Sequence, residues 1–211
     1  MSNEQEHLKA ITDIRSMMER SSRFISLSGL SGIFAGIIAL VGAAAAYIYL
    51  NLGLFSSGYY ERGIIGNSLN FDYLMFFFCN GIIVLFLALL FGTIFTVRNA
   101  KKKNIPIWDN TTKLLLINLF IPLATGGIFV LILVYHQLIY LVAPATLIFY
   151  GMALLNASKY TFKDVRYLGI FEIILGLLSS IYIGYGLLFW AMGFGLLHII
   201  YGTVMYYKYE R

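Results

Sequence analysis

Charged residues are scarce in this chain of 211 residues: Asp, Glu, Lys and Arg together make up 12% of it, about half the share of roughly 25% in an ordinary soluble domain. Hydrophobic residues make up 60%. A water-soluble globule with this composition has too little polar surface to cover itself. The composition therefore predicts a protein whose natural solvent is the lipid bilayer.

Cysteine and histidine are also rare, with one Cys and three His in the whole chain. These numbers exclude a disulfide scaffold and a zinc module. The sequence also has no phosphate-binding glycine loop, no zinc-ligand spacing and no serine-nucleophile motif. We therefore predict a protein that is not an enzyme and that holds no metal and no cofactor.

Six apolar runs of membrane-spanning length follow one another along the chain. A helix needs about 20 residues to cross the hydrocarbon core, and the backbone must satisfy its own hydrogen bonds there. The runs lack the alternation of a transmembrane β-barrel. The sequence therefore predicts an all-α fold, with a polytopic bundle over 24–207 built from three hairpins of helices at 24–50, 71–97, 113–135, 138–157, 167–184 and 186–207.

Lys and Arg lie in alternate segments between these runs. If the N-terminus is placed inside, every one of the 15 Lys and Arg residues except Arg62 lies in an inner segment. This bias predicts cytoplasmic N- and C-termini, with 208–211 as a short cytoplasmic tail. The net charge of +5 then reflects topology, and we expect no nucleic-acid partner.

The N-terminal segment, 1–23, is predicted to contain an amphipathic cytoplasmic helix over 4–21. Its apolar residues recur every three or four positions, at Leu8, Ile11, Ile14 and Met18, which makes a single stripe. A helix that binds a lipid surface is normally basic, whereas basic and acidic residues balance here. The pattern therefore favours a cytoplasmic helix that either contacts a cytoplasmic protein partner or packs against the chain itself.

Small residues recur at helical spacing and predict helix–helix contacts, because they let backbones approach in a membrane. In addition, three similar strings, LLFGT, IFYGM and IIYGT, close the second helix of each predicted hairpin, and small residues 13 positions after Arg23, Lys113 and Arg166 fall at Gly36, Gly126 and Ser179. These likenesses indicate either a two-helix unit present three times or convergence of short membrane strings. The predicted packing residues are Ser28, Gly32, Gly36, Gly92, Gly151 and Gly202.

Glu172 is the one charged residue that lies away from the ends of a predicted span, and an intramembrane carboxylate is costly and usually functional or paired. Glu172 and His198 are equally distant from Tyr185 at the turn, so an antiparallel hairpin places them at the same level. Folding the preceding hairpin brings Asn118 close to the level of Asn156. These four residues either line a cavity open to the cytoplasm or form hydrogen bonds between helices.

The stretch from Arg20 to Ala46, with Ser-Gly-Leu-Ser-Gly and its ladder of small residues, resembles the first helix of uncharacterised six-span bacterial inner-membrane proteins. The paired-helix repeat is similar in its glycine spacing to short-repeat membrane proteins linked to acid resistance. Neither resemblance supplies a catalytic residue. Both imply the cytoplasmic membrane of a prokaryote.

The sequence therefore favours a non-enzymatic multi-pass protein that acts as a membrane scaffold, sensor or accessory subunit. Its expected partners are the lipid bilayer and a cytoplasmic protein that binds 4–21. The small-residue faces meet either another helix of the same chain or a second copy in a homo-oligomer. The alternative is a small-molecule or proton-coupled transporter that uses Glu172 and His198 in a polar cavity facing the cytoplasm.

Overall fold

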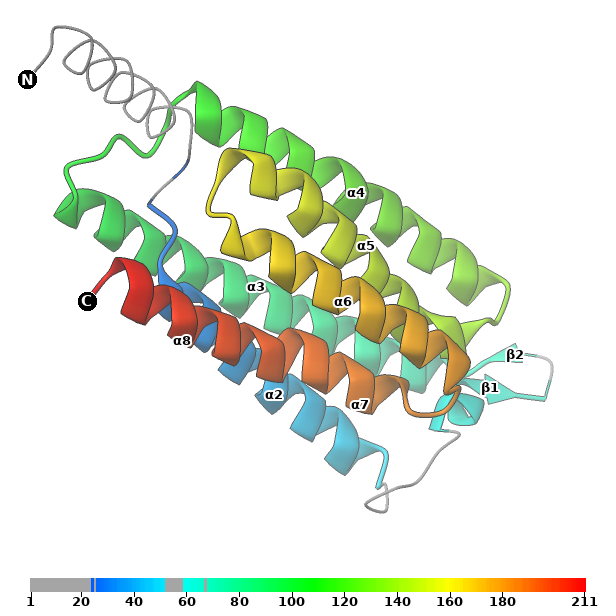
Figure 1. Cartoon of the computed structure of the whole chain (residues 1–211). Coiled ribbons are helices and arrows are strands. Elements are labelled where there is room, and N and C mark those ends of the chain that lie inside the picture. Colours follow the sequence, from blue (N-terminus) through cyan, green and yellow to red (C-terminus); the bar gives the residue numbers. More distant parts are fainter. Residues whose placement is uncertain (1–23, 25, 52–58, 67) are drawn as a thin grey trace, which may run out of the picture.

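A computed structural model describes residues 24, 26–51, 59–66 and 68–211. It is an all-α bundle, as the sequence predicts (Figure 1). The long helices are α2 (Gly29–Tyr49), α3 (Phe71–Lys102), α4 (Asn110–Tyr135), α5 (Val142–Ala157) and α6 (Asp164–Ile181), followed by α7 (Gly186–Trp190), the π-helical segment η4 (Ala191–Leu197) and α8 (His198–Tyr209). The predicted segment 1–23 lies outside the described residues.

Short elements lie at the turns of the bundle. One end, here called the loop end, carries the 3-10 helix η1 (Tyr59–Gly63), the antiparallel two-residue strands β1 (Ile64–Ile65) and β2 (Ser68–Leu69), and η2 (Ile139–Leu141). The opposite end, here called the terminal end, holds the start of α2, η3 (Ser158–Tyr160) and the C-terminus (Figure 1).

Five segments are long and apolar enough to cross a membrane: Gly29–Tyr49, Phe71–Lys102, Asn110–Tyr135, Ile139–Tyr160 and Gly186–Tyr209. The remaining long helix, α6, has 18 residues and includes Asp164, Arg166 and Glu172. Its charges are the reason that it does not belong to this apolar set, although it lies within the same bundle.

The helix boundaries follow from capping groups more than from hydrophobicity. The backbone N–H of Thr112 donates to the Asp109 carboxylate at 2.7 Å, which starts α4 three residues before the predicted run. Helix α3 extends to Lys102, beyond the predicted end at 97. Lys101 and Lys102 stabilise this last turn because cations are favourable at a helix C-terminus.

The last predicted span, 186–207, is not one regular helix. Its centre, Ala191–Leu197, is π-helical, and Gly193 and Gly195 are buried within it. A π segment inserts extra backbone into a helix and is frequent at functional sites. Hydrophobic periodicity does not reveal such a local change of pitch, which is why the sequence did not predict it.

Two pairs of helices pack through closely similar glycine contacts. A Cβ atom built on Gly36 of α2 would lie 2.6 Å from the Gly195 carbonyl oxygen and 2.7 Å from Cγ1 of Ile199. A Cβ atom built on Gly151 of α5 would meet Gly169 and Ile173 of α6 at the same two distances. Because any side chain would clash, backbone approaches backbone in both interfaces.

The reciprocal contacts of these two interfaces also correspond. Gly202 of α8 lies against Gly29 and Ile33 of α2, as Gly151 of α5 lies against Gly169 and Ile173 of α6. Gly36 lies against Gly195 and Ile199, as Gly176 lies against Pro144 and Ile148, and Ile199 and Ile148 hold the same place in the repeated string. The counterpart of Gly36 in α6 is therefore Gly176. The alignment of Gly36 with Ser179 is wrong by three residues, because the repeat follows the contact surface and not the distance from a basic residue.

Gly92 does not make the predicted helix contact within the described chain. A Cβ atom on Gly92 of α3, or on Gly127 of α4, would have no heavy atom within 4 Å. Helices α3 and α4 have no interface comparable with those of α2 with α8 or α5 with α6. The string that contains Gly92 therefore matches those around Gly151 and Gly202, but Gly92 itself faces no neighbouring helix in the described structure.

Candidate functional site: a buried polar cluster

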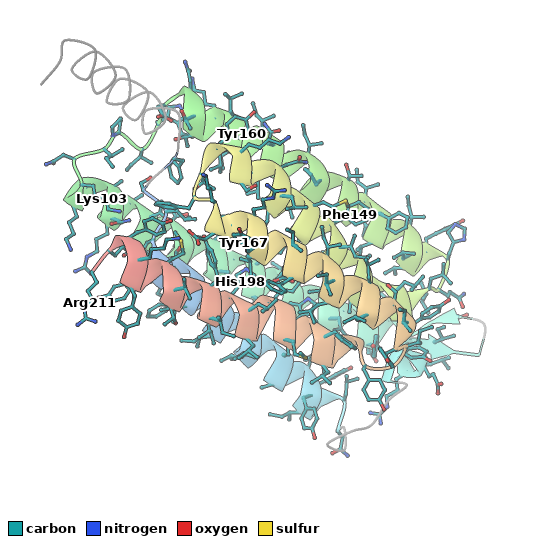
Figure 2. The ribbon with its side chains drawn as sticks, in the orientation of Figure 1. Lys103, Phe149, Tyr160, Tyr167, His198 and Arg211 are labelled. Atoms are coloured by element: carbon teal, nitrogen blue, oxygen red, sulfur yellow. The ribbon has the colours of Figure 1, made fainter. Side chains whose placement is uncertain are left out.

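Glu172 of α6 and His198 of α8 lie side by side within the bundle. Nδ1 of His198 is 3.4 Å from Oε1 of Glu172. Glu172 has no exposed surface, and His198 is 6% exposed. Figure 2 labels His198 about midway between the two ends of the bundle. Their placement at one level follows from the turn at Tyr185 between the two helices.

Two hydrogen bonds hold the His198 ring. The Tyr150 hydroxyl of α5 lies 2.8 Å from Nε2, and the Gly193 carbonyl oxygen lies 3.0 Å from Nδ1. Because a carbonyl only accepts, Nδ1 carries a proton and donates to Gly193. A neutral ring then accepts from Tyr150 through Nε2. The neutral tautomer satisfies both bonds, so His198 connects α5 with the π segment without needing a charge.

Gly193 fits against Glu172 and gives the π segment a role in the cluster. A Cβ atom on Gly193 would lie 2.5 Å from Oε2 of Glu172 and 2.5 Å from Cδ2 of Leu147. The same residue offers its carbonyl to His198. Only a residue without a side chain lets the carboxyl of α6 and the ring of α8 lie this close to one backbone.

The Glu172 carboxyl is the unusual member of the cluster. Among the described residues, both of its oxygens are buried and have no hydrogen-bond partner. Burial without a partner is costly for a neutral carboxyl and far more so for a carboxylate. Each such group in a native structure calls for an explanation, in structure or in function.

The two asparagines do not join this pair in the described structure. Nδ2 of Asn118 donates to the Leu114 carbonyl of its own helix at 2.8 Å, on an exposed face of α4. Asn156 is half-buried near the terminal end of α5 and forms no hydrogen bond with Glu172 or His198. The predicted four-residue cluster is therefore wrong in composition, because helix rotation turns Asn118 outward.

Neither of two cavities found among the described residues is lined by the Glu172–His198 pair. The larger, of about 620 Å³, lies towards the loop end and is lined by α2, α3, α4, α5 and α7, together with Ile139. The other, on the side of α3 that carries Cys79, is also remote from the pair. The pair itself is enclosed by packed side chains and glycine backbone.

Ser28 has a different role from the helix packing predicted for it. Its hydroxyl donates to Oε2 of Glu210 at 3.1 Å, and the Gly29 backbone N–H donates to the other oxygen of the same carboxylate. Glu210 thus caps the N-terminus of α2 from the far end of the chain, where the helix dipole favours an anion. This contact ties the first described helix to the last.

Gly32, Gly36, Gly151 and Gly202 all lie at close helix contacts, as the sequence predicts.

Tyr150 and Gly193 were not singled out from the sequence. Tyr150 stands immediately before Gly151 in the repeated string, which is a usable signal. No sequence signal marks the carbonyl of Gly193, because its position depends on the π segment. In the described chain, no group of three His, Cys, Asp or Glu residues is placed to hold a metal ion.

No family model, no curated protein and no solved structure matches this chain.

Proposed function

We propose that this chain is a six-span protein of a prokaryotic cytoplasmic membrane that acts without catalysis, as a scaffold, sensor or accessory subunit. The five apolar segments support membrane insertion. Helix α6 serves as the remaining span, because it packs against α5 along its length and turns its one deeply placed charged residue, Glu172, into the bundle.

The distribution of cations supports cytoplasmic termini. The described basic clusters Lys101–Lys103, Lys159 and Lys163 lie at the terminal end, as does Lys208 beside the C-terminus, whereas Arg62 lies in η1 at the loop end. Lys and Arg accumulate on the cytoplasmic side of membrane proteins. The terminal end is therefore the inner end in this proposal.

The enclosure of Glu172 is the observation that supports a scaffold, sensor or accessory role over transport. A proton-coupled transporter needs its ionisable group to reach water from each side in turn, and such groups face a cavity. Glu172 is fully buried, and its neighbour His198 is held by Tyr150 and Gly193. This geometry favours a packed junction of α5, α6 and the last span.

One observation favours the second candidate, a proton-coupled transporter. The carboxyl oxygens of Glu172 have no hydrogen-bond partner among the described residues, and the adjoining backbone is π-helical. A structural junction does not need an acidic group in such a place. This candidate requires a state in which water reaches Glu172.

Reconstitution into vesicles separates the two candidates. A pH gradient is imposed, and proton flux is compared for wild type, Glu172→Gln and protein-free vesicles. The scaffold role predicts the same flux in all three. Flux through the wild type that Glu172→Gln abolishes, with the variant still folded, would establish the transporter.

The predicted partner of 4–21 needs its own test. Deletion of residues 2–21 should leave the melting temperature of the bundle unchanged and remove a co-purifying cytoplasmic protein. Co-purification that persists at the same yield would contradict a role for this segment.

A further inference from the structure

Three pairs of helices, here called seams, each join the second helix of one predicted hairpin to the first helix of another. Two of these seams are closed and one is open. Helix α5 meets α6, and α8 meets α2, through the same arrangement of Gly and Ile residues. In both cases the second helix of one predicted hairpin packs against the first helix of another. The corresponding neighbours in the remaining case are α3 and α4, which have no comparable interface.

The cavity of about 620 Å³ lies in this open seam. Gly81 and Leu85 of α3 form one wall, and Leu131 and Val134 of α4 form the opposite wall. Helices α2, α5 and α7 close the back. Its volume is within the range of about 300–1,000 Å³ found for small-molecule sites. Since α3 and α4 do not close over it, the cavity opens sideways towards the surroundings of the bundle.

The walls of the cavity are suited to hydrocarbon. Most lining residues are aliphatic or aromatic. Its two polar side chains other than ring groups, Asn80 and Thr146, already donate to backbone carbonyls, at Gly42 and Ala143. A polar solute would lose its hydration and find few partners on these walls, whereas an alkyl chain has no hydrogen bonds to lose.

A basic side chain stands near the loop end of the cavity. Arg62 donates to the carbonyl of Leu50, and Leu50 packs in one cluster with Tyr73 and Ile139, which line the cavity. A guanidinium has five N–H donors in a planar fork that suits a phosphate. Arg62 is exposed, so one face of the fork is accessible from outside the bundle.

We propose that the open seam between α3 and α4 is a phospholipid site, in which one acyl chain fills the cavity and the phosphate group pairs with Arg62. The acyl chain fills the gap between α3 and α4, whereas the two helices of each closed seam are in direct contact. This inference concerns a different part of the molecule from Glu172 and does not depend on the function proposed above.

The test uses the full-length protein in vesicles that contain a trace of phospholipid with a photoreactive diazirine in one acyl chain. Labelled peptides are mapped by mass spectrometry. The site predicts labelling of Leu85 and Val134. In Gly81→Phe, the new ring enters the cavity and should lower this labelling about tenfold. Labelling at Phe86, which is 62% exposed, reports ordinary surrounding lipid and should not change.

Gly127→Phe is the matched control, because Gly127 also has open space around it but does not line the cavity. It should leave labelling of Leu85 and Val134 at the wild-type level. If Gly81→Phe does not fold, Val134→Trp fills the same cavity from α4, and labelling at Leu85 is read instead. Arg62→Gln should reduce labelling, and Arg62→Lys should restore part of it.

Equal labelling of wild type and the cavity-filling variant would overturn the proposal. A disulfide that forms between Leu85→Cys and Val134→Cys within one chain, in place of labelling, would show instead that α4 closes the seam. The same disulfide between two chains would show that a second copy occupies it. The background for these pairs is Cys79→Ser.

Discussion

Gly193 and Glu172 fit together so closely that a methyl group on Gly193 would lie 2.5 Å from Oε2 of Glu172. Leu147 approaches the same point from α5, and both Leu147 and Glu172 are fully buried. The π segment, the carboxyl of α6 and the ring of His198 therefore form one packed unit at the centre of the bundle.

Gly193→Ala should destabilise the protein by roughly 1–3 kcal/mol, the usual cost of extra volume in a packed interior. Thermal unfolding in detergent measures the effect. Gly127→Ala is the control, because that position is open and Ala is the better helix former. Its melting temperature should equal or exceed that of wild type, and equal losses in both variants would contradict the packed unit.

Tyr150→Phe should cost roughly 1–3 kcal/mol, because it leaves Nε2 of His198 buried without its partner. Tyr201 provides the matched control. It stands before Gly202 as Tyr150 stands before Gly151, and its hydroxyl is buried without a partner among the described residues. Tyr201→Phe should therefore leave stability unchanged or increase it. The account is wrong if Tyr201→Phe is the more damaging of the two.

Gly151→Ala and Gly202→Ala should both destabilise, since a Cβ atom at either position would meet backbone atoms of the facing helix at 2.6 Å or closer. Gly92→Ala, at the corresponding place in α3, should be tolerated. Chemical or thermal unfolding of the three variants measures the contrast. A loss for Gly92→Ala as large as for the other two would mean that a helix packs closely against the Gly92 face of α3 after all.

The Asp109 cap should make α4 sensitive to acid. The Thr112 backbone N–H and hydroxyl, which both donate to the Asp109 carboxylate, lower its pKa from the ordinary value of 3.8. A lowered folded-state pKa stabilises the fold above pH 3.8, and this contribution is lost as the pH falls through the folded-state value. Asp109→Asn keeps a capping oxygen but does not titrate. Wild type should melt at a higher temperature than the variant at pH 6, and the two melting temperatures should converge as the pH falls to 3.

Hydrophobicity was sufficient to predict the helical class, because lipid permits few structures and nearly all of the charges lie between the predicted spans or at their ends. The equal depth of Glu172 and His198 in the bundle also followed from the sequence, since the two residues are equally distant from a tight turn at Tyr185. Helix rotation was not predictable in the same way. Asn118 has a suitable depth but points outward, and no periodicity showed this in a helix that is apolar all round.

The finer features depend on contacts between distant segments. The cap that Glu210 provides for Gly29 joins opposite ends of the chain, and no local pattern announces it. The equivalence of the α2–α8 and α5–α6 interfaces was partly visible in the repeated Phe/Tyr-Gly strings. The open seam between α3 and α4 was not visible in the sequence, because the sequence shows a packing surface such as that around Gly92 but not whether a helix covers it.

Access of water to position 172 tests the central claim most directly, namely that Glu172 lies in a closed, dry junction. In a Cys79→Ser background, Glu172→Cys and Lys163→Cys are treated with a small water-soluble thiol reagent in native membranes. Lys163 is exposed at the terminal end, so its cysteine should react at once. The account predicts that the cysteine at position 172 reacts only after denaturation. Reaction of both cysteines at similar rates in the folded protein would show a water path to Glu172 and would contradict the account.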